Sequence, residues 1–280
     1  AKINIFKTKG PVVCSPAIVN DVAYFGSVDK TFYSIDINTA KEKWKFTTGN
    51  AIFSSPLFYQ GTIYFASGNI LYALDSKTGS NKWSFRESRG TIYSSPVLAK
   101  DVLYFGSSDN TLYAISAITG KLLWKYAMKG NKTLSTPAYS DELIYFGSED
   151  KNLYAIDRLT GKEKWKFSTG GPVSTPAISN GIVYFGSDDG NFYAVNARTG
   201  IERWKFKSDG PIIGSPALSS SLIYFGSWDG NLYSLNIKSG DLVWKYKSGG
   251  PITGSPIVAG DTVYFGSWDR SVYALNAQSG

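Results

Sequence analysis

The chain has no histidine, a single cysteine (Cys14) and a single methionine among its 280 residues. It therefore cannot build a zinc site from histidine and cysteine, a serine–histidine–aspartate triad or a cysteine–histidine pair. Since Cys14 has no second thiol, an internal disulfide is excluded and the redox compartment stays open. These absences remove the commonest zinc-dependent and hydrolytic chemistries.

Long apolar runs are also missing. No stretch approaches the roughly 20 residues that span a bilayer. The first ten residues, AKINIFKTKG, lack the apolar core of a signal peptide. We therefore expect either a cytosolic protein or a mature or excised form without its leader.

Aromatic side chains and glycine are abundant. The chain has 19 Tyr, 16 Phe, 8 Trp and 29 Gly, and Val and Ile are prominent among its other apolar residues. This mixture is typical of many short strands joined by tight turns.

An internal repeat of about 40 residues runs through the whole sequence. A Tyr-Phe pair begins at Tyr24, Tyr64, Tyr104, Tyr145, Tyr184, Tyr224 and Tyr264. A Ser/Thr-Pro pair precedes each one, with its proline at Pro16, Pro56, Pro96, Pro137, Pro176, Pro216 and Pro256. Six repeats continue to a tryptophan, at Trp44, Trp83, Trp124, Trp165, Trp204 and Trp244.

The fifth repeat shows how one unit folds. Its β-rich runs cover residues 172–178, 182–187, 191–196 and 202–206, and turn compositions such as SNG, DDG and ARTG separate them. All these connections are of hairpin length, so the four strands form an antiparallel meander. No helical period of 3.6 residues is present.

Neighbouring aromatic residues on one strand indicate how the units pack. Tyr184 and Phe185 must point to opposite faces, so both faces of each sheet are covered. Sheets stacked radially satisfy this demand, which predicts an all-β, seven-bladed β-propeller in one domain, 1–280. A β-solenoid is the alternative, but its coils are shorter and it needs capping ends. The predicted blades cover residues 11–49, 50–89, 90–130, 131–170, 171–209, 210–249, and 250–280 with 1–10.

The two ends of the chain complement each other. The last repeat stops at Gly280, before its fourth strand, and Phe6 near the start aligns with Phe167 of a fourth strand. We therefore expect the N-terminal strand to pair into the last blade and close the ring. Asn4 occupies the tryptophan position there, so this blade should be the least tightly held.

The segments that lead to each tryptophan resemble a known family. They read AIDRLTGKEKW at 155–165, ALDSKTGSNKW at 73–83 and AVNARTGIERW at 194–204. These segments are similar to the tryptophan-docking repeats of pyrroloquinoline-quinone-type propellers, over essentially the whole chain. In physical terms, the small Ala155 leaves room for an indole and the Thr-Gly turn offers a flat peptide on which it can lie.

That superfamily includes quinoprotein alcohol and sugar dehydrogenases, the outer-membrane assembly lipoprotein and propeller sensor domains of membrane kinases. The resemblance implies a periplasmic, cell-surface or extracellular protein, with a cytoplasmic one as the alternative. For function it implies less than for fold.

An acidic residue recurs in the turn between the second and third strands. The positions are Asp29, Asp109, Asp150, Asp189, Asp229 and Asp269. A ring of carboxylates could bind a cation or a basic partner, but aspartate also accepts backbone N–H bonds and favours tight turns. Its recurrence in six repeats favours the structural interpretation.

Trp228 and Trp268 are different, because they occur in only two adjacent blades, one residue before that aspartate. Two indoles at the mouth of the channel could stack a planar ligand, a sugar or a partner side chain. Packing onto a neighbouring loop is the equally weighted alternative.

Two other sets of side chains have mainly structural interpretations. Glu149, Asp150, Asp188 and Asp189 form an acidic patch on blades four and five that could hold a cation or a basic segment, although a solvated face is favoured. A small hydroxyl precedes each repeat's proline, as at Ser15, where converging inner strands need small side chains.

The net charge of +7 could suggest nucleic acid binding, but the lysines argue otherwise. Many lie in the fourth strands, at Lys45, Lys125, Lys166, Lys205 and Lys245. Lysine on an exposed edge strand blocks edge-to-edge pairing, and charges spread around a rim form no continuous groove.

Taken together, these features predict a monomeric, non-catalytic binding or scaffolding propeller. We expect a protein or small ligand at the channel mouth, and no nucleic acid, metal or cofactor. The predicted binding residues are Trp228, Trp268, Asp229, Asp269, Glu149 and Asp188. The alternatives are a ligand-sensing domain of a larger membrane protein and a quinoprotein-type dehydrogenase using pyrroloquinoline quinone with calcium. The resemblance implies that such enzymes build their quinone pocket from long insertions and often adjacent cysteines, so the short hairpin loops and the single cysteine disfavour the enzyme.

Overall fold

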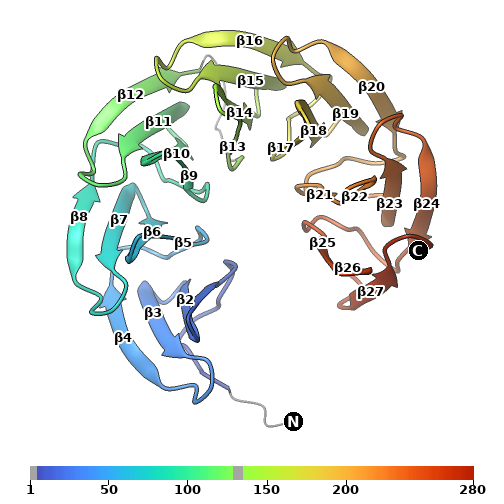
Figure 1. Ribbon diagram of the computed structural model, residues 1–280. Helices are drawn as coiled ribbons and strands as arrows, with labels where there is room; N and C mark the ends of the chain where they lie inside the picture. The colour runs from blue at the N-terminus through green and yellow to red at the C-terminus, as the bar shows by residue number, and fades with distance from the viewer. Residues whose placement is uncertain (1–4, 129–134) are drawn as a thin grey trace. The chain divides into compact units, whose positions relative to one another are not determined.

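The computed structural model describes residues 5–128 and 135–280, which divide into two compact units, residues 1–136 and 137–280 (Figure 1). Each unit is described by itself. Throughout the described residues the regular elements are strands, and none of them is a helix that could span a membrane. The predicted single domain 1–280 stays a prediction.

Unit 1 contains three four-stranded antiparallel sheets, numbered here in chain order. Sheet 1 consists of β1 (Ala17–Val19), β2 (Val22–Gly26), β3 (Thr31–Asp36) and β4 (Glu42–Thr47). Sheet 2 consists of β5 (Leu57–Tyr59), β6 (Thr62–Ser67), β7 (Ile70–Asp75) and β8 (Asn81–Phe85). Sheet 3 consists of β9 (Val97–Ala99), β10 (Val102–Ser107), β11 (Thr111–Ser116) and β12 (Leu122–Ala127).

Unit 2 contains four sheets, of which the last has three strands in the described residues. Sheet 4 consists of β13 (Ala138–Tyr139), β14 (Leu143–Gly147), β15 (Asn152–Asp157) and β16 (Glu163–Ser168). Sheet 5 consists of β17 (Ala177–Ser179), β18 (Ile182–Gly186), β19 (Asn191–Asn196) and β20 (Glu202–Lys207). Sheet 6 consists of β21 (Ala217–Leu218), β22 (Leu222–Gly226), β23 (Asn231–Asn236) and β24 (Leu242–Lys247). Sheet 7 consists of β25 (Ile257–Ala259), β26 (Thr262–Gly266) and β27 (Val272–Asn276).

Every sheet is a meander in which each strand pairs with the next along the chain, as the repeat predicted. The fourth strand therefore forms one edge, and it carries the exposed lysines, such as Lys45 in β4. The third and fourth strands shift register beside the residue opposite each tryptophan, for example between Ala194 and Val195 in sheet 5. Such a bulge increases local twist and re-aims the side chain.

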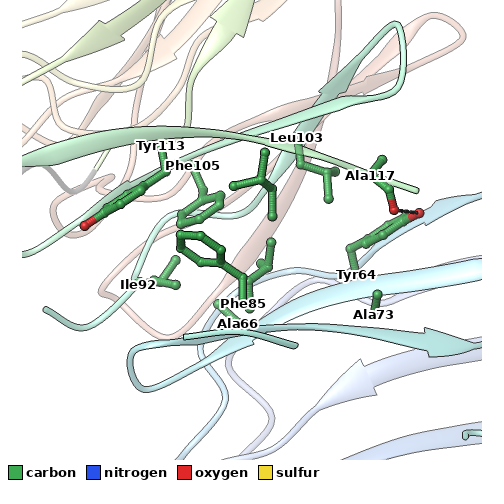
Figure 2. Close-up of a cluster of buried hydrophobic side chains, with 11 residues drawn as sticks. Tyr64, Ala66, Ala73, Phe85, Ile92, Leu103, Phe105, Tyr113 and Ala117 are labelled. Atoms are coloured by element: carbon green, nitrogen blue, oxygen red, sulfur yellow. Dashed lines mark hydrogen bonds between the residues drawn. The ribbon is translucent and has the colours of Figure 1, made fainter. Parts of the chain in front are cut away.

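Aromatic packing between neighbouring sheets buries both of their faces. Between sheets 2 and 3, Phe85 meets Phe105 and Tyr113 edge-on, with ring centroids 5.7 and 5.5 Å away (Figure 2). The Tyr64 hydroxyl donates to the carbonyl of Ala117 at 3.0 Å, which gives this large buried ring its polar partner. The two-sided burial inferred from the Tyr-Phe pairs is confirmed.

Five of the six docking tryptophans lie on a glycine turn of the following repeat within their own unit. Trp44 donates its Nε1–H to the carbonyl of Ser76 at 2.9 Å, and a methyl group built on Gly79 would lie 2.6 Å from the Trp44 ring. Gly79 also has a φ of 73°, which side chains disfavour. The same stacking places Trp83, Trp165, Trp204 and Trp244 on Gly120, Gly200, Gly240 and Gly280.

The first repeat departs from this rule in a consistent way. Ala40 occupies the position of Gly79, with a φ of 53°. The residue that aligns with its docking tryptophan is Asn4, which lies outside the described residues. The one repeat with a methyl group at this turn position is thus the one whose aligned partner in the sequence is not a tryptophan.

Small hydroxyls tie neighbouring inner strands together. The backbone N–H of Ser15 donates to Ser55 Oγ at 3.1 Å, and that of Ser55 donates to Ser95 Oγ at 2.9 Å. Unit 2 repeats the bond between Ser215 and Ser255, at 3.0 Å. The predicted steric explanation is thus incomplete, since these side chains also supply hydrogen bonds between repeats.

Ring closure by the N-terminal segment stays a prediction, and each unit supports it separately. In unit 1, Phe6 contacts Phe25 and Tyr33, at 6.2 and 5.4 Å, as Phe85 contacts its own two partners. In unit 2, Val272 on β27 is 81% exposed, although Leu153 at the same repeat position is completely buried.

A pair of cysteines tests this closure in a Cys14→Ser background. Lys7 and Ser271 align with Ser168 and Asn152, which are paired in sheet 4. We expect Lys7→Cys with Ser271→Cys to form a disulfide under mild oxidation, seen as an electrophoretic shift that reductant reverses. Lys7→Cys with Asn191→Cys, the same position in sheet 5, should form none, and equal cross-linking of both pairs would contradict the prediction.

Removing a docking indole should weaken folding strongly. Trp44 is 8% exposed, so Trp44→Ala should lower the free energy of unfolding by about 3–5 kcal/mol, from lost burial and a residual cavity. Urea denaturation measures this. The exposed neighbour Lys45 provides the control, since Lys45→Ala should change stability by less than about 0.5 kcal/mol. Coincident unfolding curves of the two variants would refute the docking role.

Candidate functional site

Two exposed tryptophans meet on one face of unit 2. Trp228 lies in the β22–β23 turn and Trp268 in the β26–β27 turn, with ring centroids 5.4 Å apart and planes inclined by 52°. Their exposed fractions are 40% and 64%, although indoles are usually well buried. We call this pair the indole platform.

The backbone around the platform is fixed by the loops that enter sheets 6 and 7. The N–H of Trp228 donates to the carbonyl of Pro211 at 2.9 Å, and that of Trp268 donates to Pro251 at 3.0 Å. The Trp268 Nε1–H donates to Thr253 Oγ1 at 2.9 Å. Both turns thus lie on the same face as the loops that enter their sheets. Trp268 packs towards the inner segment that contains Thr253, while its ring stays exposed.

The aspartates beside the two indoles are occupied by internal hydrogen bonds. Asp229 Oδ2 accepts from the Tyr233 hydroxyl at 2.7 Å and from the Asp209 N–H at 3.1 Å, while Oδ1 accepts from the Asn231 N–H at 2.8 Å. Asp269 repeats the pattern, with the Tyr273 hydroxyl at 2.6 Å. In the structure these bonds hold the turns, and a partner-binding role for both residues stays a prediction.

The electrostatics of these turns follow from the same bonds. Burial by itself raises the pKa of Asp229, but the hydrogen bonds from Tyr233 and Asn231 outweigh it, so the pKa lies below its usual value. In sheet 3, burial and the Asp109 carboxylate raise the pKa of Tyr113 to about 12. Similar bonds to Asp29, Asp109, Asp150 and Asp189 support the structural interpretation of the recurring aspartate.

An acidic cavity adjoins the platform. Asp188, Asp189 and Asp209 line a cavity of about 370 Å³ together with Lys207 and Pro211, and Pro211 is also the residue that accepts the Trp228 N–H. Burial, and then the charge of Asp189, raise the pKa of Asp188. The Lys207 ammonium is held by the backbone carbonyl of Asp189 at 2.6 Å.

The other members of the predicted acidic patch are less closely joined to this cavity. Asp150 accepts from the Tyr154 hydroxyl at 2.6 Å, which is again a turn contact. Glu149, in the β14–β15 turn, makes no ion pair or hydrogen bond among the described residues. The structure therefore brings Asp188 to the platform's neighbourhood but shows no contact between it and Glu149.

Exposed apolar residues on the inner segments were missed by sequence reasoning. Ile213, which follows the buried Ile212, is 44% exposed in unit 2. Unit 1 has a second exposed aromatic pair at Phe53 and Tyr93, with centroids 6.2 Å apart. The sequence carries a signal for them, because these residues share one repeat position: Phe53, Tyr93 and Ile213 each stand three residues before a proline.

Stacking, contacts with cations and shape recognition are what this arrangement can supply. Indole faces attract flat and cationic groups, and Asp188 and Asp209 add negative charge nearby. In the described part of the chain, no three acidic or cysteine side chains gather as possible metal ligands.

Repeated antiparallel sheets whose tryptophans dock on the next repeat's glycine turn define a propeller of pyrroloquinoline-quinone-like repeats. More particularly, the chain belongs to the family described as outer membrane protein assembly factor BamB, which matches residues 6–133, 88–175 and 168–280. The resemblance drawn from the tryptophan segments is confirmed.

Solved structures show the same fold. BamB from Moraxella catarrhalis superposes with a TM-score of 0.81 at 20% identity, covering 97% of this chain and 87% of that one. A europium-containing methanol dehydrogenase superposes with a TM-score of 0.76 at 16% identity, covering 93% of this chain and 72% of that one. A comparison with curated protein sequences found no significant match. The two structural relatives, an assembly factor and an enzyme, share a fold without sharing a function.

Acid should destabilise the protein through the turn aspartates. Because the pKa of Asp229 is lowered in the folded chain, its stabilising contribution is present above about pH 4, its unfolded pKa, and is lost as the pH falls through its folded pKa. Asp157, whose pKa hydrogen bonds from Thr160 lower to about 2, acts in the same direction.

Urea denaturation between pH 2 and 7 measures this decline. Asp229→Asn should cost about 1 kcal/mol at pH 7 and flatten the acid limb, because the amide cannot titrate. Asp261→Asn is the control, since this exposed carboxylate makes no hydrogen bond in the described structure. An unchanged acid limb in the Asp229 variant would refute the assignment.

Proposed function

We propose that the chain is a non-catalytic, protein-binding propeller that holds its partner on the indole platform. The observation that carries the proposal is the contact between Trp228 and Trp268, which remain exposed although the rest of each turn is fixed by hydrogen bonds. Tryptophan is enriched among residues that dominate binding energy at protein interfaces. A rigid, exposed aromatic pair loses little conformational entropy when a partner covers it.

The family supports a protein partner. Its description names an assembly factor for outer membrane proteins, and the BamB structure has the same fold over nearly the whole chain. We extend this role to the chain and propose that it works outside the cytoplasm, in the periplasm, as a monomeric scaffold.

A quinoprotein dehydrogenase is the second candidate, favoured by the likeness to methanol dehydrogenase. The residues of the platform do not fit a calcium-bound quinone. Asp229 and Asp269 already accept hydrogen bonds from tyrosines and backbone amides, so a cation would have to displace these bonds. We derive no catalytic step from them.

Affinity capture from the native source tests the scaffold. Trp228→Ala with Trp268→Ala should weaken binding at least tenfold, as expected for hot-spot residues, measured with the purified partner once mass spectrometry has identified it. Phe53→Ala with Tyr93→Ala is the matched control, because it removes another exposed aromatic pair. Equal capture by the platform variant, or loss only in the control, would contradict the proposal.

The same variants separate the scaffold from a ligand sensor in a larger membrane protein. A sensor would show a thermal shift with a small molecule that the platform variant abolishes, and no loss of protein capture. A scaffold would show the reverse.

A further inference from the structure

A second recess lies between sheets 5 and 6, at the opposite strand ends from the indole platform. It has a volume of about 360 Å³. Its floor is apolar and aromatic, formed by Ile182, Tyr184, Trp204 and Ile237, and its rim carries Arg203 and Lys238. We call it the basic groove. Its volume lies within the range of small-molecule sites.

Arg203 lacks the carboxylate that neutralises its counterparts. In sheets 2 and 4 the cation before the docking tryptophan pairs with the aspartate that ends the third strand: Lys82 with Asp75 at 3.6 Å and Lys164 with Asp157 at 3.2 Å. In sheet 5 the aspartate position is Asn196, and Arg203 forms no ion pair among the described residues. Its positive charge is uncompensated.

Lys238 adds a second unpaired cation from the next repeat. It follows Asn236, again where other repeats have aspartate, and its ammonium forms no ion pair in the described structure. The carboxylates nearest in sequence are engaged elsewhere: Glu202 lies 4.0 Å from Lys205, and Asp241 accepts from the Ser239 hydroxyl at 2.6 Å. The rim is therefore positive.

The equivalent groove between sheets 4 and 5 has the opposite character. It has a similar volume, about 370 Å³, but its lining includes Asp141 and Glu142 beside Arg198. Asn180, which lines the basic groove, occupies the repeat position of Asp141, and the position of Glu142 is occupied by the uncharged Gly181. The two grooves thus have similar volumes and differ in charge.

The floor also offers a hydrogen-bond donor. Trp165 and Trp244 donate their Nε1–H groups to the carbonyls of Ala197 and Ala277, both at 3.1 Å. The corresponding carbonyl, that of Ile237, accepts only from the Tyr184 hydroxyl at 3.2 Å, and Trp204 Nε1 makes no hydrogen bond in the described residues. Trp204 lines the groove, and its indole N–H has no protein acceptor among the described residues.

We propose that the basic groove binds a small organic anion with a flat hydrocarbon body. Its carboxylate or sulfonate is held between Arg203 and Lys238, because charge-assisted bonds are strongest where no protein carboxylate competes. Its flat body contacts the accessible parts of Trp204 and Ile182, since Tyr184 beneath them is only 3% exposed.

Calorimetric titration with naphthoate tests this site, with naphthamide as its neutral isostere. We expect saturable binding of naphthoate and at least tenfold weaker binding of the amide. Arg203→Gln and Lys238→Gln should each weaken naphthoate binding about tenfold, as loss of a charge-assisted bond does. Asn196→Asp should also weaken naphthoate binding several-fold, because the new carboxylate would pair with Arg203 as Asp157 pairs with Lys164.

Matched variants keep the test specific. Lys164→Gln with Arg198→Gln alters the acidic groove and should leave naphthoate affinity unchanged. Trp228→Ala with Trp268→Ala should also leave it unchanged, so the scaffold proposal and this one fail separately. Circular dichroism and thermal melts establish that every variant folds. The proposal would be overturned if naphthoate binding did not saturate, if naphthamide bound with the same affinity, or if the Lys164/Arg198 variant lost as much naphthoate affinity as the Arg203 and Lys238 variants.

Discussion

The structure depends on one repeated contact, shown by five docking tryptophans, in which the indole of one repeat's fourth strand lies on the glycine turn of the next repeat. The contact requires a tryptophan such as Trp44, a positive-φ glycine such as Gly79 and a carbonyl that accepts the indole N–H. Because donor and acceptor belong to different repeats, no sheet completes its own packing. Each repeat is stable through its neighbours, as in other repeat architectures.

This dependence explains why most polar side chains are structural. The turn aspartate, the tyrosine that donates to it and the hydroxyl before each proline recur because every repeat must hold the same turns and inner strands. Function is then expected where the repeats differ. The indole platform and the basic groove both arise from such differences: Trp228 and Trp268 in two repeats, and Asn196 in place of an aspartate.

The site was only partly predictable from the sequence. Trp228 and Trp268 stood out because they break the repeat, and the structure brings them into contact. A binding role for Asp229 and Asp269 stays a prediction, and the structure adds their hydrogen-bond partners, which lie four residues later and in the preceding entry loop. Arg203 could not be recognised, since its significance lies in a missing ion pair.

Sequence alone determined the fold class, the number of repeats and the order of strands, since local turn chemistry and alternating aromatic pairs specify a meander buried on both faces. It also identified the docking tryptophans. Only the tertiary structure decided which turn receives each indole, which carboxylates are already bonded and where charge is left uncompensated. Docking joins Trp44 to Ser76, 32 positions later, and the Asp229 carboxylate also accepts from Asp209, 20 positions earlier, so both depend on packing that no local pattern records.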